Sequence, residues 1–459
     1  MRSTSNPNLV ISAAAFSCLV VTLLQSLVVP AIPLLPGVLG VSPTTVSWVV
    51  TITLLVGAAA TPIVGRLSDM LPRKGLMVII MALVFLGSAI APLGGIATLI
   101  VGRALQGLGT AIVPVAMAHM RLSLPPARIA GALALLSATL GIGGSVGIPL
   151  GGVLLSSFGW ASMFIAAAVL SAIATAALWF FLPAEEKTGN RTTFDYPGAF
   201  LLTLALSAIL ILLSQGSQWG WSNPLVWLLV FAAAVFSVIW GRVELKTSAP
   251  LVDLRTARFR PVLFTNIASI FMGIAMFTNL LLTTLILQNP PSEGGFAWSA
   301  SAAGLAMLPS AAVMLIVAPI SAALSTRLGS LRLLALGSGI SAIGYALRIV
   351  FSGAAWWMIT TTTVVSLGVG IAYAAMPMVM VAYAPPAEIG SANAVNALMR
   401  AIGMALSSAI VTAVSIAFAT DFGPSATALF MLGAIGIVLS LLSVILSLAA
   451  TPKKDAPRD

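Results

Sequence analysis

Apolar segments of about 20 residues, the length needed to cross a bilayer, follow one another along nearly the whole chain. Inside hydrocarbon the backbone polar groups of such a segment must be satisfied within the helix itself. Of the 459 residues, 59% are hydrophobic and only 7% are charged, whereas soluble domains carry roughly 25% charged residues. The sequence therefore predicts an all-α polytopic membrane protein.

The apolar segments predict fourteen transmembrane spans when they are divided at charged, Pro-rich or Gly-rich connectors. The predicted spans are 9–31, 45–65, 75–94, 97–119, 128–155, 158–182, 197–215, 223–242, 262–287, 301–324, 331–351, 355–383, 392–417 and 425–450. Only a short turn near Trp219 separates the seventh span from the eighth.

The basic residues predict the orientation, because Lys and Arg accumulate in cytoplasmic loops. A cytoplasmic N-terminus places nearly all of them in cytoplasmic segments, and the outer loops hold no Lys or Arg unless Arg348, near the outer end of its span, reaches out. Most tryptophans then fall at span ends, where the indole ring favours the membrane interface. We therefore expect both termini in the cytoplasm and a multi-pass protein of the inner (cytoplasmic) membrane.

Several classes of protein are excluded. The net charge of +10 does not indicate nucleic-acid binding, because the basic residues stand singly or in small groups between apolar runs. The one cysteine, Cys18, lies in the first apolar run, which argues against disulfides and thiolate metal sites. With one histidine, His119, and no cluster of nucleophile, base and acid, we expect neither a metal site nor an enzyme. The first run has no small-residue cleavage site and should remain as a helix.

A weak internal repeat suggests two related halves. The segment 62–71 recurs as 319–328, with Pro, Ile, Leu, Ser and Leu at corresponding places near the cytoplasmic end of a span. Transporters are often built from such repeats. We expect an N-terminal six-helix bundle at 1–182, a linker with two additional transmembrane helices at 183–261, a C-terminal six-helix bundle at 262–450 and a cytoplasmic tail at 451–459. A chance match in so biased a composition is the alternative.

Three motifs carry a family resemblance. Residues 65–74 (GRLSDMLPRK) are similar to the loop signature between the second and third helices of the major facilitator superfamily. Residues 103–109 (RALQGLG) resemble its fourth-helix motif, and residues 141–152 resemble the fifth-helix antiporter motif associated with exporters. The span count and the DYPGA sequence at 195–199 resemble the fourteen-helix drug:proton antiporter branch. The resemblance covers essentially the whole chain and implies a major facilitator fold, with two six-helix bundles plus two inserted helices.

By this resemblance, Gly65, Asp69, Arg73 and Lys74 form a conformational latch. Asp69 ends the second span, so its carboxylate can pair with nearby cations or face the positive N-terminal end of a helix in the other bundle. Contacts of this kind, made in one conformation and broken in the other, would control alternating access. The alternative is a solvated turn whose cations only reflect topology.

Two arginines are expected in the substrate or coupling pathway. Arg103 lies inside the fourth span, where a guanidinium exposed to hydrocarbon costs several kcal/mol, so it should face the bundle interior. Snorkelling to the outer interface is the alternative. Arg400 follows the same logic in the thirteenth span. Gln25, Gln106 and Asn279 complete the predicted pathway.

Small residues in the fifth span form the predicted antiporter motif: Gly143, Gly147, Pro149, Gly151 and Gly152. Glycines about four residues apart let another helix approach closely, and proline bends a helix. We expect this span to act as a pivot between the bundles. Simple packing of small residues against lipid is the alternative.

The chain departs from the drug:proton antiporter pattern at Gln25, where that branch typically carries an acidic residue. Every carboxylate is expected in a loop, with Asp195 and Glu244 in cytoplasmic ones. The membrane interior would then offer arginines and no counter-charge. Neutral or anionic substrates are therefore favoured over cations.

Proton coupling also lacks an obvious carrier, because arginine stays protonated. The remaining candidates are Asp69, or Glu293 and Asp421 if these dip inward. Uncoupled, facilitated export is the alternative.

The sequence thus predicts a secondary active transporter that exports lipophilic small molecules, such as drugs or secondary metabolites, by alternating access. The expected energy source is the proton gradient, with no cofactor. The expected partners are a small lipophilic substrate and membrane lipids, with no nucleic acid, and we expect a monomer. A lipid or glycolipid exporter is the second transport hypothesis. A sensor or scaffold without transport is disfavoured, because large soluble segments are lacking.

Overall fold

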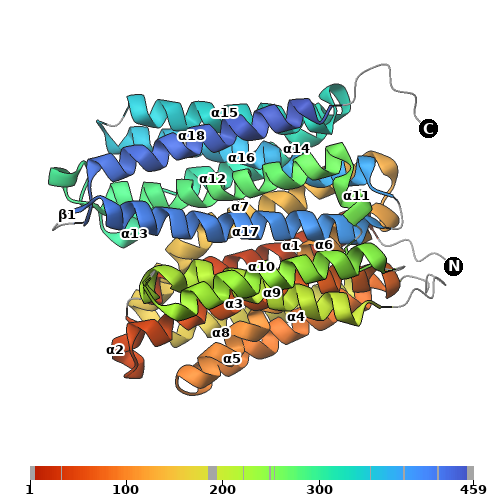
Figure 1. The fold of residues 1–459 in the computed structure, drawn as a ribbon, viewed down its shortest axis with the longest axis horizontal. Coiled ribbons are helices and arrows are strands. Elements are labelled where there is room, and N and C mark those ends of the chain that lie inside the picture. Colours follow the sequence, from red (N-terminus) through yellow and green to blue (C-terminus); the bar gives the residue numbers. More distant parts are fainter. Residues whose placement is uncertain are drawn as a thin grey trace.

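The structure is a computed structural model that describes residues 6–32, 34–184, 194–220, 222–247, 250–252, 254–351, 353–385, 388–420 and 423–451. Thirteen of the described helices are long and apolar enough to cross a membrane, and a bent pair of helices makes a fourteenth span. The predicted fourteen spans are therefore confirmed. The chain enters α1 and leaves α18 at the same end of the molecule, which we call the proximal end; the opposite end is the distal end (Figure 1).

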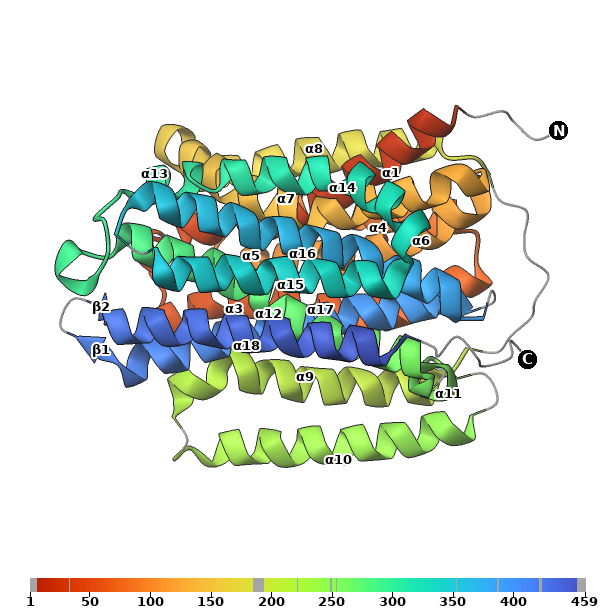
Figure 2. The same ribbon diagram turned by 90° about the horizontal axis from the view of Figure 1, so that it is seen from above.

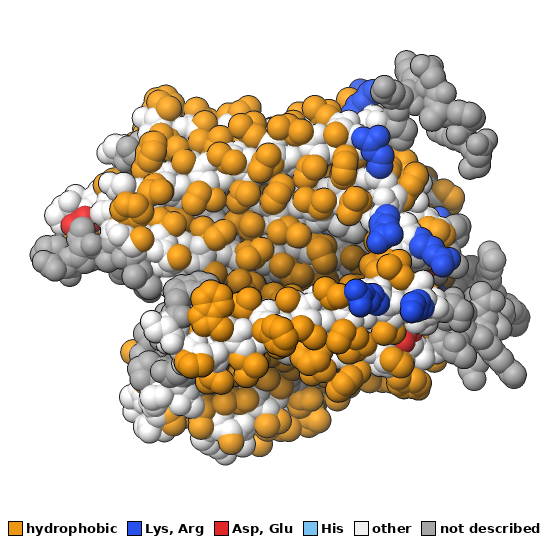
Figure 3. Space-filling view, in the orientation of Figure 1, with side chains coloured by type: hydrophobic (Ala, Val, Ile, Leu, Met, Phe, Trp, Pro, Cys, Tyr) orange, Lys and Arg blue, Asp and Glu red, His pale blue; other side chains and the backbone are white. Residues whose placement is uncertain are grey.

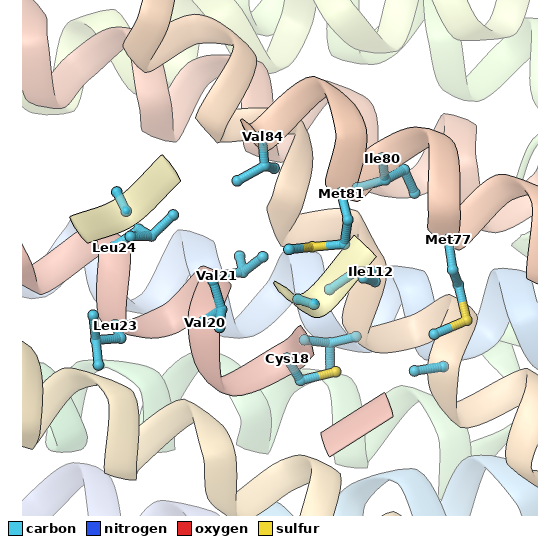
Figure 4. Packing of buried hydrophobic residues seen from close by; sticks show 14 of the residues in the cluster. Cys18, Val20, Val21, Leu23, Leu24, Met77, Ile80, Met81, Val84 and Ile112 are labelled. Carbon is cyan, nitrogen blue, oxygen red and sulfur yellow. The ribbon is translucent and has the colours of Figure 1, made fainter. Parts of the chain in front are cut away.

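Six spans form the N-terminal half. They are α1 (Pro7–Leu27), α3 (Pro43–Met70), α4 (Arg73–Ile90), the broken span of α5 (Ile96–Gly107), η3 (Leu108–Ala111) and α6 (Ile112–Ser123), α7 (Pro126–Phe158) and α8 (Ala161–Phe181). In the interior, Cys18, Val21 and Leu24 of α1 lie near Met81 and Val84 of α4 (Figure 4). The buried Cys18 packs here as a small hydrophobic side chain.

Six further spans form the C-terminal half. They are α12 (Arg260–Gln288), α13 (Ala300–Leu305) with α14 (Leu308–Leu328), α15 (Ser330–Val350), α16 (Ala355–Tyr383), α17 (Ile389–Ala417) and α18 (Ala426–Ala449). The two halves share one packing pattern: α1 packs along α7 and α4 along α8, and at the corresponding places α12 packs along α17 and α15 along α18. This correspondence supports the internal repeat suggested by the sequence.

The two additional helices, α9 (Tyr196–Trp219) and α10 (Pro224–Lys246), form an antiparallel hairpin at the edge of the molecule (Figure 2). α9 contacts α3 of the N-terminal half and α17 of the C-terminal half, whereas α10 packs mainly on α9. Toward the distal end, Gln215 of α9 donates hydrogen bonds to Ser47 (3.0 Å) and Thr51 (3.1 Å) of α3. α9 therefore touches both halves.

Short elements occupy the connectors. They are η1 (Val29–Ala31), α2 (Leu35–Leu39), η2 (Ala91–Leu93), α11 (Leu254–Arg258), η4 (Pro291–Glu293), and an antiparallel pair of strands, β1 (Ala419–Thr420) and β2 (Gly423–Pro424), with Thr420 opposite Gly423. α11 joins the hairpin to α12 at the proximal end (Figure 2).

Two predicted spans are not straight helices. The fourth span changes to a 3₁₀ turn, η3, between α5 and α6. The tenth span bends by 47° where Ala302–Val317 meets Pro319–Leu328, because a proline inside a helix lacks the N–H donor and its ring clashes with the preceding turn. Several helices also extend beyond the predicted spans; α7, for example, runs from Pro126 to Phe158 instead of 128–155.

Hydrophobic side chains dominate the face shown in Figure 3, and basic side chains gather near its proximal end. The basic residues of α10 and α11 are exposed: Arg242, Lys246, Arg255 and Arg258. An apolar belt with basic residues at one rim is the surface expected of a protein embedded in a bilayer.

Candidate transport pathway and gate

The carboxylate of Asp69 joins the two halves at the proximal end. Asp69 lies in the last turn of α3, and its Oδ2 accepts a hydrogen bond from the backbone N–H of Ser391 (3.1 Å) in the first turn of α17. The N–H of Gly390 also bonds to this carboxyl group, and Arg66 adds positive charge nearby. On the N-terminal side, Arg73 Nη2 lies 3.8 Å from Asp69 Oδ1. Because the N-terminal end of a helix favours negative charge, Asp69 holds α17 against α3.

Gly65 lets these two helices approach closely. A Cβ at Gly65 would collide with the Cβ of Ala394 and would lie 3.4 Å from the carbonyl oxygen of Gly390. Small residues at a crossing let the two backbones come together, as the motif requires. The crossing of α3 and α17 next to Asp69 therefore depends on a residue without a side chain.

Lys74, the fourth predicted latch residue, lies elsewhere. Its Nζ donates a hydrogen bond to the carbonyl oxygen of Leu182 (2.6 Å), directly after α8. A cation at this position satisfies a carbonyl group left unpaired at the end of that helix. The structure thus brings together Gly65, Asp69 and Arg73, and it separates Lys74 from them.

Arg103 points into the N-terminal half and is 2% exposed. Its Nε donates to the carbonyl oxygen of Val49 on α3 (3.2 Å), and its Nη1 donates to the carbonyl oxygen of Leu24 on α1 (3.2 Å) and to Oε1 of Gln106 (2.9 Å). Gln106 Nε2 in turn donates to Ser88 Oγ on α4 (2.9 Å). The guanidinium therefore faces the bundle interior, and it does not snorkel to the surface. Four helices meet at this network.

Arg348, which lies near a span end, turns inward and does not reach the surface. It is 3% exposed, and its Nη2 donates to Oδ1 of Asn279 (2.7 Å) and to Oγ1 of Thr362 (2.5 Å). The Thr362 hydroxyl is also hydrogen-bonded to the Thr283 hydroxyl (2.7 Å). Asn279, which was predicted in the pathway, thus helps to hold the buried guanidinium of Arg348 between α12, α15 and α16.

Arg400 is 3% exposed and lies in the C-terminal half. Its Nη1 donates to Oδ1 of Asn396 one turn earlier, and its guanidinium lies 5.4 Å from the centre of the Tyr373 ring. Asn396 Nδ2 donates to Asn266 Oδ1 (3.1 Å) and to Ser269 Oγ (2.7 Å). Arg400 therefore belongs to a polar network between α12, α16 and α17.

The guanidiniums of Arg103, Arg348 and Arg400, deep within the spans, are each held by uncharged groups. Among the described residues of the two halves, the carboxylates lie at the ends: Asp69 and Glu388 near the proximal end and Glu293 in η4 at the distal end. Asp421 lies outside the described residues. The described interior of the two halves therefore carries positive charge without a carboxylate beside it.

The glycines of the antiporter motif pack α7 against α1 of the same half. A Cβ would meet Thr22 at Gly143, Ser26 at Gly147 and the carbonyl oxygen of Leu27 at Gly151. These three glycines therefore give α7 a close approach to α1, while α7 also packs along α14 of the C-terminal half. Their neighbour α1 is fixed by Ser26 Oγ, which donates to the carbonyl oxygen of Gly143 (2.9 Å).

Two residues of the 141–152 segment face the other half, Gly141 and Pro149. A Cβ at Gly141 would strike the side chain of Met314 on α14. A Cβ at Gly304 of α13 would lie 3.5 Å from Cγ of Pro149. Gly152, the last motif residue, is half-buried.

Gln25 is half-buried on α1, next to Leu24, whose carbonyl oxygen accepts a hydrogen bond from Arg103. Gln25 thus follows directly in the chain a residue that belongs to the Arg103 network, and its own side chain is uncharged.

Asp195 and Glu244 are buried, which corrects the expectation that both lie in cytoplasmic loops. Asp195 caps the N-terminus of α9 and is 6% exposed; Glu244 lies within α10 and is 2% exposed. Residues 250–252 fold back onto the hairpin after α10 and cover these side chains. This contact could not be predicted from the sequence of each span taken separately.

Sequence reasoning also missed Thr362 and Asn396, which accept from Arg348 and Arg400, and Ser88, which accepts from Gln106 beside Arg103. The signal was present, because polar side chains inside apolar spans usually face other polar groups rather than lipid. What the sequence did not show was which arginine each of them meets.

The profile of the Major Facilitator Superfamily matches residues 14–408 of the chain. Among characterised relatives, Multidrug resistance protein Stp of Mycobacterium tuberculosis is 30% identical, over 80% of this chain and 68% of its own length. The Tetracenomycin C resistance and export protein of Streptomyces glaucescens is 26% identical, over 87% of this chain and 74% of its own length. The uncharacterised MFS-type transporter YhcA of Bacillus subtilis is 26% identical over 72% of this chain, and the match spans only 61% of that relative.

Among solved structures, the human organic anion transporter MFSD10 (TETRAN) superposes with a TM-score of 0.66 at 15% identity, over 97% of this chain and 100% of that chain, and so shares its fold. The profile match covers most of the sequence, so the protein belongs to the Major Facilitator Superfamily of transporters and is a multi-pass membrane protein. Its similarity to multidrug resistance and export proteins places it in the drug-efflux branch of that superfamily.

Proposed function

We propose that the protein exports small lipophilic molecules, such as drugs or secondary metabolites, across the cytoplasmic membrane by alternating access. The observation that carries this proposal is the contact of Asp69 in one half with the first turn of α17 in the other. These hydrogen bonds hold the proximal end closed, and their loss would let the halves separate there. Relatives named for multidrug resistance and for resistance and export support a lipophilic cargo.

The proton gradient is the proposed energy source, and no cofactor takes part. Asp69 is suitably placed for this role, because protonation would remove the charge that the N-terminus of α17 attracts. A proton bound there would weaken the contact between the halves and favour opening of the proximal end.

The proposed substrates are neutral or anionic. A cation entering the interior would approach Arg103, Arg348 or Arg400, and the described interior offers it no carboxylate in return. One uncompensated pair of unit charges 4 Å apart is worth about 4 kcal/mol at an effective dielectric constant of 20. About a third of that energy, 1.4 kcal/mol, already changes binding tenfold.

Transport into inverted membrane vesicles, with and without a proton gradient, tests this proposal across a panel of neutral, anionic and permanently cationic lipophilic compounds. We expect neutral or anionic compounds to be carried best. Gln25→Asp should raise cation transport and introduce a new pH dependence, because it adds a carboxylate next to Leu24 of the Arg103 network. Gln25→Asn is the matched control, since it changes the side chain without adding charge. Efficient export of quaternary ammonium compounds by the wild type would contradict the charge argument.

A lipid or glycolipid exporter is the second candidate. It is favoured by an apolar groove between α4 and α8, lined by Phe85, Leu93, Ala161 and Ile165 among others, which suits an acyl chain. A fluorescent phospholipid added to the vesicle panel separates the two candidates. Its movement between leaflets, with no export of soluble lipophilic compounds, would favour the lipid.

A further inference from the structure

Two carboxyl groups meet inside the α9–α10 hairpin, away from the three arginine networks. Asp195 precedes α9, and its Oδ1 accepts a hydrogen bond from the N–H of Gly198 (2.9 Å). Glu244 lies in the last turn of α10, where its Oε1 accepts from the N–H of Val252. The N–H of Leu251 also bonds to the Glu244 carboxyl group. One oxygen of each carboxyl group is thus engaged by the backbone.

The second oxygen of each carboxyl group faces the other residue. Asp195 Oδ2 and Glu244 Oε2 are both buried and accept no hydrogen bond from any described donor. Both crowd the position of a Cβ at Gly198: Oε2 would lie 2.7 Å from it and Oδ2 closer still. The two side chains are within hydrogen-bonding reach of each other. Because carboxylate oxygens are only acceptors, they form a bond here only when one proton lies between them.

The surroundings offer this pair no buried counter-charge among the described residues. The basic side chains of α10 and α11 are exposed at the surface: Arg242, Lys246, Arg255 and Arg258. Arg66 of α3 acts on Asp69, and Glu388, before α17, is a further acidic group beside Val252. Two buried carboxylates without a counter-charge repel each other, whereas one shared proton removes the repulsion and satisfies both oxygens.

We propose that Asp195 and Glu244 bind one proton between Oδ2 and Oε2, and that this proton ties the hairpin to residues 251–252. This is a proton-binding site outside both six-helix halves, on the two helices that the chain inserts between them. Its use in transport rests on the proposed function; the binding of the proton itself does not.

The site also adjoins the contact between the halves. Val252, whose N–H bonds to Glu244, and Ser391, whose N–H bonds to Asp69, line the same small cavity. Leu251 and Val252 further pack in one apolar cluster with Leu398 of α17. If the proton leaves, the two carboxylates separate and displace residues 251–252, against which α17 begins. Protonation of the pair is thereby linked to the Asp69 contact through adjoining packed groups.

Infrared spectroscopy of the purified full-length protein in lipid nanodiscs detects the proton directly. At neutral pH the wild type should show the C=O stretch of a protonated carboxyl group, and Asp195→Asn and Glu244→Gln should each abolish it. Glu293→Gln, which removes a carboxyl group in η4, is the matched control and should leave the band in place.

A double variant tests the sharing of one proton. In either single variant the new amide NH₂ group donates to the remaining carboxylate, so the thermal unfolding temperature should stay close to that of the wild type. In Asp195→Asn/Glu244→Gln both amide oxygens remain with their backbone donors, and two NH₂ groups face each other. The double variant should therefore unfold several degrees below either single variant, a coupling that independent surface carboxylates would not show.

Gly198→Ala tests the geometry, because its methyl group would lie between the two carboxyl groups. We expect loss of the infrared band and a lower unfolding temperature. Gly241→Ala on α10, where a Cβ meets nothing within 4 Å, is the matched control and should be nearly neutral.

Absence of a protonated-carboxyl band in the wild type would overturn the proposal, and so would a double variant as stable as the single variants. A band present in a protein whose transport ignores the proton gradient would leave the proton site standing and remove only proton-driven export.

Discussion

At the level of single residues, the interior of the two halves contains arginine side chains that are not paired with carboxylates. Arg103, Arg348 and Arg400 are nearly fully buried, and they are held by carbonyl, amide and hydroxyl oxygens and by an aromatic ring rather than by carboxylates. A guanidinium has five N–H donors, so several uncharged acceptors can satisfy it while its charge remains. The resulting positive interior is the physical basis for the proposed substrate preference.

The sharpest prediction at this scale concerns Asp69. Asp69→Asn keeps an oxygen that can accept from Ser391 but removes the charge, so the contact with α17 should lose about 1–2 kcal/mol. We expect slower transport and a proximal end that opens more often. In a Cys18→Ala background, a cysteine placed at Ala394 should then react faster with a thiol reagent.

Glu293→Gln serves as the control for Asp69→Asn, because it removes a carboxylate far from the contact. If Asp69→Asn left both transport and labelling unchanged, the charge of Asp69 would have no part in holding α17 against α3.

At the scale of elements, glycine and hydroxyl side chains set how closely the helices pack. α1 lies in a groove of α7 formed by Gly143, Gly147 and Gly151, and the hydroxyls of Thr22 and Ser26 bond to α7 carbonyl oxygens. The C-terminal half uses the same device between α12 and α17, where a Cβ at Gly273 or Gly403 would strike the backbone of the partner helix. Close packing of this kind makes each half a firm unit.

A pair of neighbouring glycines tests this packing. Gly147→Ala would push a methyl group against Ser26 and the carbonyl oxygen of Leu23 (2.7 Å), so we expect it to destabilise the fold by about 1–3 kcal/mol. Gly144→Ala places its methyl group in open space and should be nearly neutral. Thermal unfolding in detergent compares the two variants. Equal unfolding temperatures would mean that α1 can move away from α7 without cost.

At the scale of the whole molecule, the two halves place a buried arginine at matching positions but on different helices. Arg103 is the eighth residue of α5, and Thr362 is the eighth residue of α16. Ser88 is the third residue from the end of α4, and Arg348 is the third from the end of α15. The guanidinium thus comes from the fourth span of one half and from the third span of the other.

The orientation of the whole molecule in the membrane is predicted from its basic residues. In intact cells, a cysteine at Ser292 in η4 should react with an impermeant thiol reagent from outside, because η4 lies at the distal end (Figure 1). A cysteine at Thr188, outside the described residues, should be protected. Labelling at Thr188 with protection at Ser292 would reverse the orientation.

The number of spans, the place of the inserted pair and the family could all be predicted from the amino-acid sequence. These features depend on the apolar length of each segment and on motifs within single connectors, which neighbouring residues specify. The inward direction of Arg103 was also predictable, because the cost of exposing a guanidinium to hydrocarbon is set by its own depth in the helix.

The partner of each polar group, in contrast, depends on how the helices pack against one another. Gly143, Gly147 and Gly151 face α1, Arg348 turns inward to Asn279, and Asp195 meets Glu244. Asp69 contacts a backbone N–H 322 residues away. Such partners are chosen by how whole helices pack side by side, and a small rotation of one helix exchanges one neighbour for another. The sequence of a single span therefore does not specify which residues of other helices its polar side chains contact.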